Sequence, residues 1–312
     1  MSELPPLSAA NTPTDEPQAI RPNEECIVCG ATAWERHFDI LLKCRHCDYV
    51  RADLDLDNPV INDLYDETYF SGGEYGDYLG DRDVHVRNFR RRYDMLIRHA
   101  GRPKSVFEIG CAYGLWLELL TRENIPACGM DICEEPVKYA AESLHQNAKF
   151  GDFLTADIPA GAHDVYCMWD TIEHLSHPEQ FVQKVYDLLP PGGWFFATTG
   201  DIGAWMARFR GKKWRMIHPP THLHYFSGAT AEKMLRRIGF DNVSIESVSV
   251  YRNLRSVIGS LIALRKGPMK TLAGIANAVT PGWVQDNLGA WINLGDIMLM
   301  SSQKPHHAKN NN

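Results

Sequence analysis

The sequence contains no long apolar run, no excess of basic charge and no export signal. A membrane-spanning helix needs about 18 consecutive apolar residues, and because no stretch reaches that length we expect no transmembrane segment. Basic residues number 32 against 39 acidic ones, giving a net charge of −7. Nucleic acid is therefore not an expected partner, since proteins that bind it cluster lysine and arginine against phosphates. Residues 1–22 are acidic and proline-rich without an apolar core, so we predict a disordered leader and a cytoplasmic protein.

The composition is that of a globular protein. Hydrophobic residues make up 44% and charged residues 23% of the chain, values that exclude a coiled coil, a collagen or a wholly disordered chain. A length of 312 residues is about twice that of a typical single domain. We therefore expect one large domain and one small domain.

The small domain is predicted from the spacing of four of the eight cysteines. Two CxxC pairs are formed by Cys26, Cys29, Cys44 and Cys47, whereas the other four cysteines lie among apolar residues and are expected to be buried thiols. Four thiolates complete the tetrahedral shell of a structural zinc ion, and such an ion stabilises a segment too short to form its own core. We predict a zinc ribbon over residues 23–55, with free thiols and a redox-active CxxC as the alternatives.

The large domain is predicted from short apolar runs that alternate with amphipathic segments, which is typical of a parallel sheet with helices on both faces. Strands are predicted at 104–109, 126–131, 147–150, 164–168, 193–199, 242–250 and 294–303, and helices at 83–101, 113–123, 134–146, 178–189 and 228–238. Residues 251–291 interrupt this pattern with two apolar stripes at helical spacing, which predict a helical insertion. Arg90, Arg91 and Arg92 follow one another in the first of these helices. We interpret them as a solvated helix face, with anion binding as the weaker alternative.

The turn after the first parallel strand is typical of a cofactor-binding loop. Glu108 ends the strand, and Gly110, Ala112 and Gly114 lead into the next helix, so that a ligand can approach backbone amides. A carboxylate here repels a pyrophosphate but attracts the cationic amino group and sulfonium of S-adenosylmethionine. The GxAxG spacing also departs from the GxGxxG pattern of dinucleotide-binding folds. This turn therefore favours S-adenosylmethionine as the cofactor.

The predicted cofactor site continues along the ends of the next strands. Asp131 is placed to accept hydrogen bonds from both ribose hydroxyls, Asp152 from an adenine amino group, and Phe153 to lie against the adenine ring. We also assign three further side chains to the cofactor site, namely Tyr69, Ile132 and Trp169.

These motifs resemble those of class I S-adenosylmethionine-dependent methyltransferases over residues of about 65 to 303. The matching segments are EIGCAYG, the strand end at Asp131, GDF, HDVYCMWDTIEHLSHP, LLPPGGWFFATT and GDIMLMSSQKP. The CxxC pairs, YDETYF and PPTHLHYFS are similar to a narrower group, the deoxysugar C-methyltransferases and related enzymes of polysaccharide and natural-product pathways. Two departures are Ala112, in place of the middle glycine, and Thr221, where the sugar enzymes tend to have glutamate.

The resemblance implies an α/β, Rossmann-like, seven-stranded and mostly parallel sheet with an antiparallel last strand, and a cofactor at the carboxyl ends of the strands. We accordingly expect a methyltransferase domain over residues 56–303, with the insertion at 251–291, a zinc ribbon before it and a disordered tail at 304–312.

Two histidine-bearing segments are candidates for catalysis. The resemblance singles out His222 in PPTHLHYFS, and an imidazole with a pKa near 6.5 can remove a proton from an acceptor at neutral pH. The other segment, WDTIEHLSHP, follows the fourth strand and brings Asp170, Glu173 and His174 toward the methyl group. In one alternative, these residues and a later histidine bind Mg or Zn and acidify a hydroxyl. In another, the glutamate and histidines are purely structural.

The acceptor is predicted from the loop that precedes His222. Residues 201–224 carry five basic side chains and one acidic side chain, and the aromatic residues Trp205, Phe209 and Trp214 lie among them. Such a loop attracts an anionic substrate. We expect O- or C-methylation of a small sugar-containing or anionic acceptor, such as a nucleotide-sugar or a lipid-linked saccharide, by a monomer or homodimer. The alternatives are an RNA methyltransferase and an inactive cofactor-binding partner protein.

Overall fold

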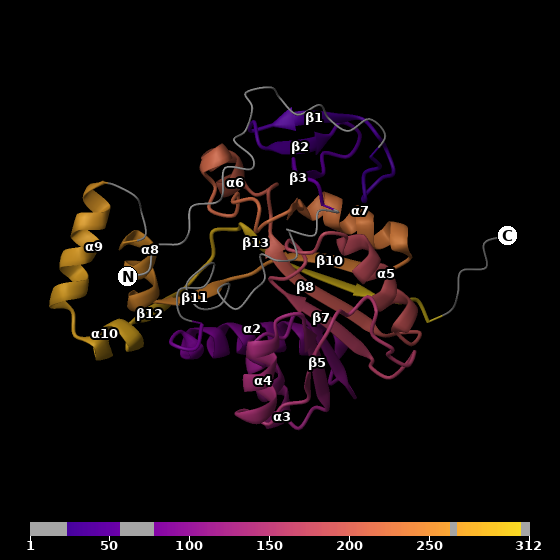
Figure 1. Cartoon of the computed structure of the whole chain (residues 1–312), viewed down its shortest axis with the longest axis horizontal. Helices are drawn as coiled ribbons and strands as arrows, with labels where there is room; N and C mark the ends of the chain where they lie inside the picture. The colour runs from indigo at the N-terminus through magenta and orange to yellow at the C-terminus, as the bar shows by residue number, and fades with distance from the viewer. Residues whose placement is uncertain (1–23, 57–77, 263–266, 307–312) are drawn as a thin grey trace.

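The computed structural model describes residues 24–56, 78–262 and 267–306 (Figure 1). The predicted leader, residues 307–312 of the predicted tail, and Tyr69 lie outside these ranges. No helix within them is long and apolar enough to cross a membrane.

A seven-stranded sheet forms the centre of the large domain, with the strand order β10-β13-β8-β7-β4-β5-β6. Its strands are β4 (Val106–Ile109), β5 (Ala127–Asp131), β6 (Ala148–Phe150), β7 (Val165–Trp169), β8 (Trp194–Gly200), β10 (Asp241–Ser247) and β13 (Ile297–Gln303). The last strand, β13, runs antiparallel to both of its neighbours, and the other pairs are parallel. This confirms the predicted Rossmann-like α/β fold with its antiparallel last strand.

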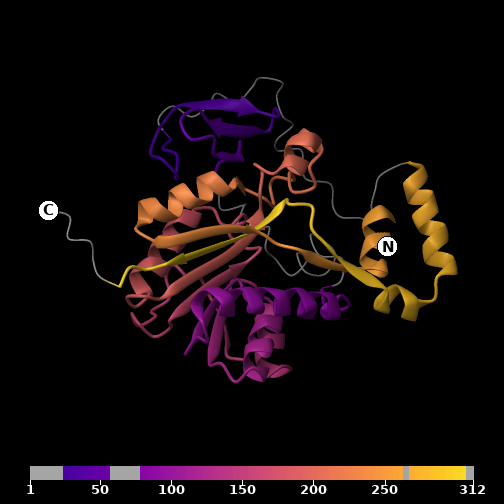
Figure 2. The ribbon, with the colours of Figure 1, turned by 180° about the vertical axis from the view of Figure 1, so that it is seen from behind.

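Helices cover both faces of the sheet (Figure 2). One face packs against α5 (Pro178–Leu188) and α7 (Gly228–Ile238), and the other against α2 (Arg82–Ala100), α3 (Leu115–Arg122) and α4 (Glu134–Glu142). Successive residues of β4 belong to different cores, Val106 to one and Phe107 to the other, because strand side chains alternate between faces. Burial on both faces explains why β4 and β7 are apolar along almost their whole length.

A smaller sheet, called the cysteine-bearing sheet, carries the four CxxC cysteines at the end of one strand and in the segments beside its strands, and a distant segment completes it. Strands β1 (Trp34–His37), β2 (Leu41–Cys44) and β3 (Val50–Ala52) pair in order, and β9 (His224–Tyr225) pairs antiparallel with β3. The sequence pattern did not predict β9, because a two-residue strand has no periodicity. Its pairing places β3 directly against the segment that contains His222.

The insertion contains the predicted helices and also a two-stranded sheet. The helices are α8 (Leu254–Ile262), α9 (Pro268–Val279) and α10 (Gly282–Asn287), and the strands are β11 (Val250–Asn253) and β12 (Gly289–Ile292). The strand predicted at 242–250 ends at Ser247, and Val250 begins β11. The insertion projects to one side of the large sheet (Figure 1). Within the basic loop, α6 (Trp205–Arg210) is followed by the 3₁₀ turn η3 (Gly211–Lys213).

Candidate active site

The loop between β4 and α3 folds sharply at the carboxyl end of the sheet. Gly110, Ala112 and Gly114 all have positive φ angles, of +78°, +42° and +71°. At Gly110 a side chain is also excluded by space, because a Cβ atom would lie 2.6 Å from Oγ1 of Thr171. The sharp turn therefore requires glycine at Gly110, and the cofactor-binding role of the loop stays a prediction.

Asp131 ties this loop to the end of β5. Its two carboxylate oxygens accept hydrogen bonds from the backbone amides of Ala112, at 2.8 Å, and Cys133, at 3.0 Å. Burial raises the pKa of Asp131, although these amide donors lower it. A carboxylate has about four lone-pair sites, so ribose hydroxyls can still bind beside the two amides.

Glu108 is fully buried next to Asp131. Its Oε2 atom has no hydrogen-bond partner among the described residues, and burial, with a further contribution from Asp131, raises the pKa of Glu108 well above its usual range. A buried carboxyl group without a partner is costly. A cationic group bound at this loop would stabilise the ionised form of the Glu108 carboxyl group. The amino group of S-adenosylmethionine is such a cation.

Three of the residues assigned to the cofactor site differ in how exposed their side chains are. The ring of Phe153 is 2% exposed and packs in the core, with its centroid 5.7 Å from that of Phe107 and 5.9 Å from that of Phe181. The assignment of this ring to adenine is therefore corrected, because Phe153 belongs to the core on the α5 and α7 face of the sheet. Asp152 is exposed and its Oδ1 accepts a hydrogen bond from the amide of Leu154. Ile132 lies directly after Asp131 and is 48% exposed.

The end of β7 carries an ion pair that the sequence did not indicate. Arg92 of α2 pairs with the carboxylate of Asp170, and its guanidinium carbon lies 5.5 Å from the ring centroid of Trp169. Thr198 donates a hydrogen bond of 2.8 Å to Asp170. Burial acts to raise the pKa of Asp170, but Arg92 and Thr198 outweigh it and lower the pKa. The Nε1 group of Trp169 is buried without a partner among the described residues.

Beyond Asp170, three of the predicted catalytic side chains meet. Ligand atoms of Glu173, His174 and His222 all lie within 4.8 Å of one another, and all three side chains are buried. The Nδ1 of His174 lies 2.8 Å from the carbonyl oxygen of Thr221, and the Nδ1 of His222 lies 2.9 Å from that of Met216. Because a carbonyl can only accept, each Nδ1 donates, and Nε2 of each imidazole is left as the acceptor.

Burial also sets the charge of this cluster. It raises the pKa of Glu173 to about 8 and lowers the pKa of His174 to about 4 and that of His222 to about 2. Both imidazoles are therefore neutral at pH 7. His218, whose ring centroid is 3.8 Å from that of His222, lies at the edge of the cluster. Asp170 does not join the cluster, because Arg92 and Thr198 hold it.

The four cysteines of the small sheet also converge. The Sγ atoms of Cys26 and Cys47 are 3.6 Å apart, as are those of Cys29 and Cys44, and all four lie within 4.8 Å of one another. Thiolates at 2.3 Å from a tetrahedral zinc ion lie about 3.8 Å apart. The spacing of these sulfur atoms therefore fits a single ion.

Residues 81–245, just over half of the chain, match the family model described as methyltransferase domain. The curated relatives include ubiquinone biosynthesis O-methyltransferases from Pectobacterium atrosepticum and Chromobacterium violaceum. The first is 29% identical over 129 residues, covering 38% of this chain and 54% of the relative, and the second is 30% identical over 116 residues, covering 35% and 50%. The chain thus spans about half the length of these relatives.

Solved structures share the fold at low identity. One is phosphoethanolamine N-methyltransferase 2 of Haemonchus contortus in complex with S-adenosyl-L-methionine, with a TM-score of 0.53, 14% identity and coverage of 78% of this chain and 60% of that one. Another is the complex of the Haloferax volcanii Trm112 methyltransferase activator with a methyltransferase, with a TM-score of 0.50, 17% identity and coverage of 74% and 95%. These likenesses show the fold, and the family model that matches over half of the chain shows that the chain belongs to the family of methyltransferase domains.

Proposed function

We propose that the protein transfers the methyl group of S-adenosylmethionine to a hydroxyl group of a small acceptor. Membership of the methyltransferase-domain family and the O-methyltransferases among the curated relatives support this reaction. In the structure, the supporting observation is the buried Glu108 with an unpartnered oxygen at the β4 loop.

The cofactor would be held by residues at the ends of β4 and β5. We assign Glu108 to its amino group, Asp131 to the ribose hydroxyls and Ile132 to the adenine ring, with backbone amides of the Gly110–Gly114 loop around the carboxylate. When bound, S-adenosylmethionine supplies an electrophilic methyl group. The protein then has to orient the acceptor in line with that methyl group and receive the acceptor's proton.

For that proton, the geometry favours a metal-assisted route over the free imidazole base that the sequence predicted. An imidazole with a pKa of about 2 is a weak base. Two neutral imidazoles and one carboxylate form the ligand set of many divalent metal sites. Each histidine here is fixed by a backbone hydrogen bond at Nδ1, and a bound cation would favour the ionised form of Glu173. We propose that Glu173, His174 and His222 bind a divalent cation such as Zn²⁺, which would lower the pKa of the acceptor hydroxyl.

The Cys26, Cys29, Cys44 and Cys47 cluster is proposed as a second, structural zinc site. Its four thiolates leave no position for a substrate, because four ligands already complete tetrahedral zinc. The sugar-containing acceptor stays a prediction, supported by the basic loop alone, and a phenolic or other hydroxyl acceptor fits the named relatives equally well.

A methyl-transfer assay tests the proposed reaction. Labelled S-adenosylmethionine is incubated with panels of sugars, nucleotide-sugars, phenols and RNA, and products are identified by mass spectrometry. We expect an O-methylated small molecule. Activity that is lost with EDTA and restored by Zn²⁺ or Mg²⁺, and lost in Glu173→Ala, supports the metal. If the activity resists EDTA but is lost in His222→Ala, His222 is the general base and no metal is required.

If methylated RNA is the sole product, the acceptor is RNA and not a small molecule. No transfer to any acceptor, despite cofactor binding, would favour the inactive partner protein.

A further inference from the structure

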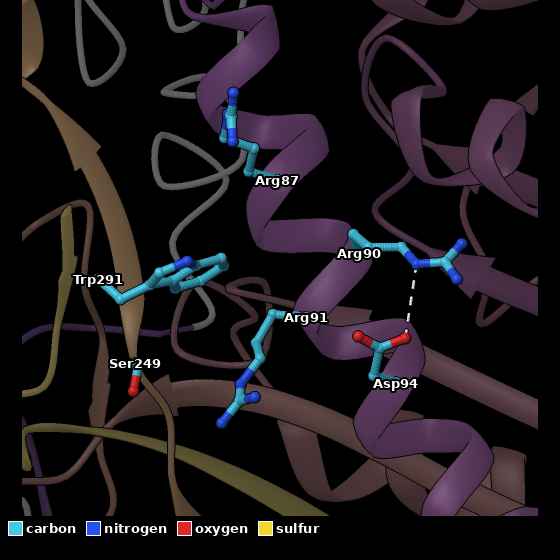
Figure 3. Close-up of a pocket in the computed structure, with 6 residues that line it drawn as sticks. All are labelled: Arg87, Arg90, Arg91, Asp94, Ser249 and Trp291. Carbon is cyan, nitrogen blue, oxygen red and sulfur yellow. Dashed lines mark ion pairs between the residues drawn. The ribbon is translucent and has the colours of Figure 1, made fainter. Parts of the chain in front are cut away.

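A pocket separate from the proposed active site lies between α2 and the base of the insertion (Figure 3). Its volume is about 380 Å³, which is within the range of small-molecule sites. It is lined by Arg87, Arg90, Arg91, Asp94, Ser249 and Trp291. None of these residues belongs to the proposed methyl-transfer site.

The arginines of this pocket differ in their partners. Arg90 points away from Trp291 in Figure 3 and pairs with Asp94, at 3.5 Å, and with Glu123. For Arg87 and Arg91, the described part of the chain provides no carboxylate partner. These two lie at positions i and i+4 of one helix, where like charges repel. The pocket therefore holds positive charge that the described side chains do not neutralise.

Trp291 provides the opposite wall of the pocket. It belongs to β12, is 48% exposed, and pairs in register with Tyr251 of β11. The guanidinium carbon of Arg87 lies 4.9 Å from the centroid of the Tyr251 ring, which fixes this arginine next to the hairpin. An indole ring beside two guanidinium groups suits a ligand that carries both a planar ring and an anion.

We propose that this pocket binds a phosphate-bearing ligand with a planar ring. The side chains of Arg87 and Arg91 point in opposite directions in Figure 3, and that of Arg87 lies over the ring of Tyr251. The ring would therefore lie against Trp291 and the phosphate would bind the guanidinium group of Arg91, whose N–H groups can donate in pairs to phosphate oxygens.

Calorimetry with phenyl phosphate tests this site, with S-adenosylhomocysteine present in excess to fill the cofactor site. The protein should bind phenyl phosphate more tightly than inorganic phosphate or phenol. Arg87→Ala with Arg91→Ala should weaken binding roughly tenfold or more. Trp291→Leu should remove the preference for phenyl phosphate over inorganic phosphate. Arg98→Ala, on the same helix and paired with Glu246, is the control and should bind as the wild type does.

Unchanged binding in the double arginine variant, or no binding by the wild type, would overturn the anion site. Equal affinity for phenyl phosphate and inorganic phosphate would overturn the ring-binding part and leave free phosphate as the ligand.

A different set of contacts joins the small sheet to the residues of the proposed metal site. The amide of Ala52, at the end of β3, donates to the carbonyl oxygen of Leu223, while the amides of Leu223 and His224 donate to that of Glu173. The segment around β9 therefore lies between the cysteine-bearing sheet and the loop that carries Glu173 and His174.

His224 is the side chain that spans this junction. It is buried, its Nε2 lies 3.3 Å from the carbonyl oxygen of Ser176, and its Nδ1 contacts the hydroxyl of Tyr49. Because the carbonyl can only accept, Nε2 carries the hydrogen, and the hydroxyl of Tyr49 donates to Nδ1. One imidazole thus links the small sheet to the loop that precedes α5.

We infer that His224 is a positioning residue that holds the side chains of His222 and Glu173 in place relative to each other. This inference rests on the proposed function of that cluster. His224→Leu should lower kcat about tenfold or more with KM and the affinity for S-adenosylhomocysteine unchanged. His224→Gln, whose amide can still donate to Ser176, should recover most of the activity.

A readout that needs no activity is the tautomer of His222. Nitrogen NMR of labelled histidine should show Nδ1 protonated in the wild type and a mixture of tautomers in His224→Leu. An unchanged tautomer with unchanged kcat would overturn the positioning role, and equal loss in both His224 variants would do the same. If the wild type transfers no methyl group but the tautomer of His222 still changes in His224→Leu, the proposed function is wrong and the positioning role of His224 stands.

Discussion

A buried carboxyl group needs a cation, hydrogen-bond donors or a proton to offset its lost hydration. Asp131 and Asp170 have such partners within the protein, in backbone amides and in Arg92. Glu108 and Glu173 each have one oxygen without a partner among the described residues. Glu179 also has a buried oxygen without such a partner. At residue scale, a ligand's positive charge would be stabilising at these glutamates, and the proposed function assigns the cofactor to Glu108 and a metal to Glu173.

Asp131→Ala and Glu108→Gln should weaken the binding of S-adenosylhomocysteine. Loss of a hydrogen bond to a buried charge costs about 1.5–3 kcal/mol, equivalent to about ten- to hundredfold in Kd. Calorimetry measures the effect, with Glu142→Ala on the exposed surface of α4 as the control. Wild-type affinity in Asp131→Ala would remove this residue from the cofactor site.

His85 should make folding sensitive to acid. Burial first, and then Arg92 and Arg252, lower its pKa to about 4, against an opposing effect of Asp170. The unfolded chain binds this proton near pH 6.5, so stability is lost as the pH falls from about 6.5 toward 4, by about 1–3 kcal/mol. Urea melts at pH 7.5 and 5 should show a smaller loss in His85→Gln. His145→Gln, at an exposed position, should retain the full loss.

Arg92 shows what residue-level prediction missed at this site. It is the third of three consecutive arginines, and charge alone gives no sign that one is buried against Trp169 and Asp170 while its neighbours are exposed. Its helical spacing from Phe89 and Leu96, both buried, was the available signal. Glu108 and Asp131 were accessible to prediction because strand ends in an open parallel sheet meet at one edge.

At the scale of elements, the cysteine-bearing sheet should depend on metal. We expect one zinc ion for Cys26, Cys29, Cys44 and Cys47, in addition to any metal at the histidine cluster. Cys26→Ser with Cys44→Ser should lose that ion and lower the melting temperature, because bound metal contributes folding free energy to such a small unit. Elemental analysis of Glu173→Ala, which lacks a ligand of the histidine cluster but keeps the four cysteines, measures the zinc bound by the cysteines alone. A zinc-free protein would contradict this assignment.

The seven strands and the helices between them were predictable because they alternate along the chain, a pattern that locates even β4, with four residues, and β6, with three. Strands β9 and β11 lie outside that alternation and were not predicted. β9 has two residues and β11 four, and each forms only because a partner strand from elsewhere in the chain satisfies its backbone. Sequence periodicity records burial, whereas a pairing of this kind depends on tertiary contacts.

At the scale of the whole molecule, exposed apolar side chains gather on the insertion. Nine of the fourteen large hydrophobic residues that are exposed in the described chain lie between Val257 and Leu294. With a pI near 6.0, charge repulsion between molecules is weakest close to that pH. We expect concentration-dependent self-association at pH 6 and less at pH 8, measured by light scattering. Leu272→Ser with Ile275→Ser should reduce it, and Phe150→Ser, on the opposite sheet edge, should not. A monodisperse monomer at both pH values would contradict this expectation.

The pairing of β3 with β9 also constrains when the protein can fold during synthesis. Tyr49 and His224, which meet at this junction, are 175 residues apart. Contacts of such long range form late, since the intervening chain must first be made and brought into place. The cysteines emerge from the ribosome long before the fourth strand of their sheet exists. If the proposed zinc site is correct, metal capture by the cysteines would precede sheet completion, and zinc supplied during translation would raise the yield of native protein more than zinc added afterwards.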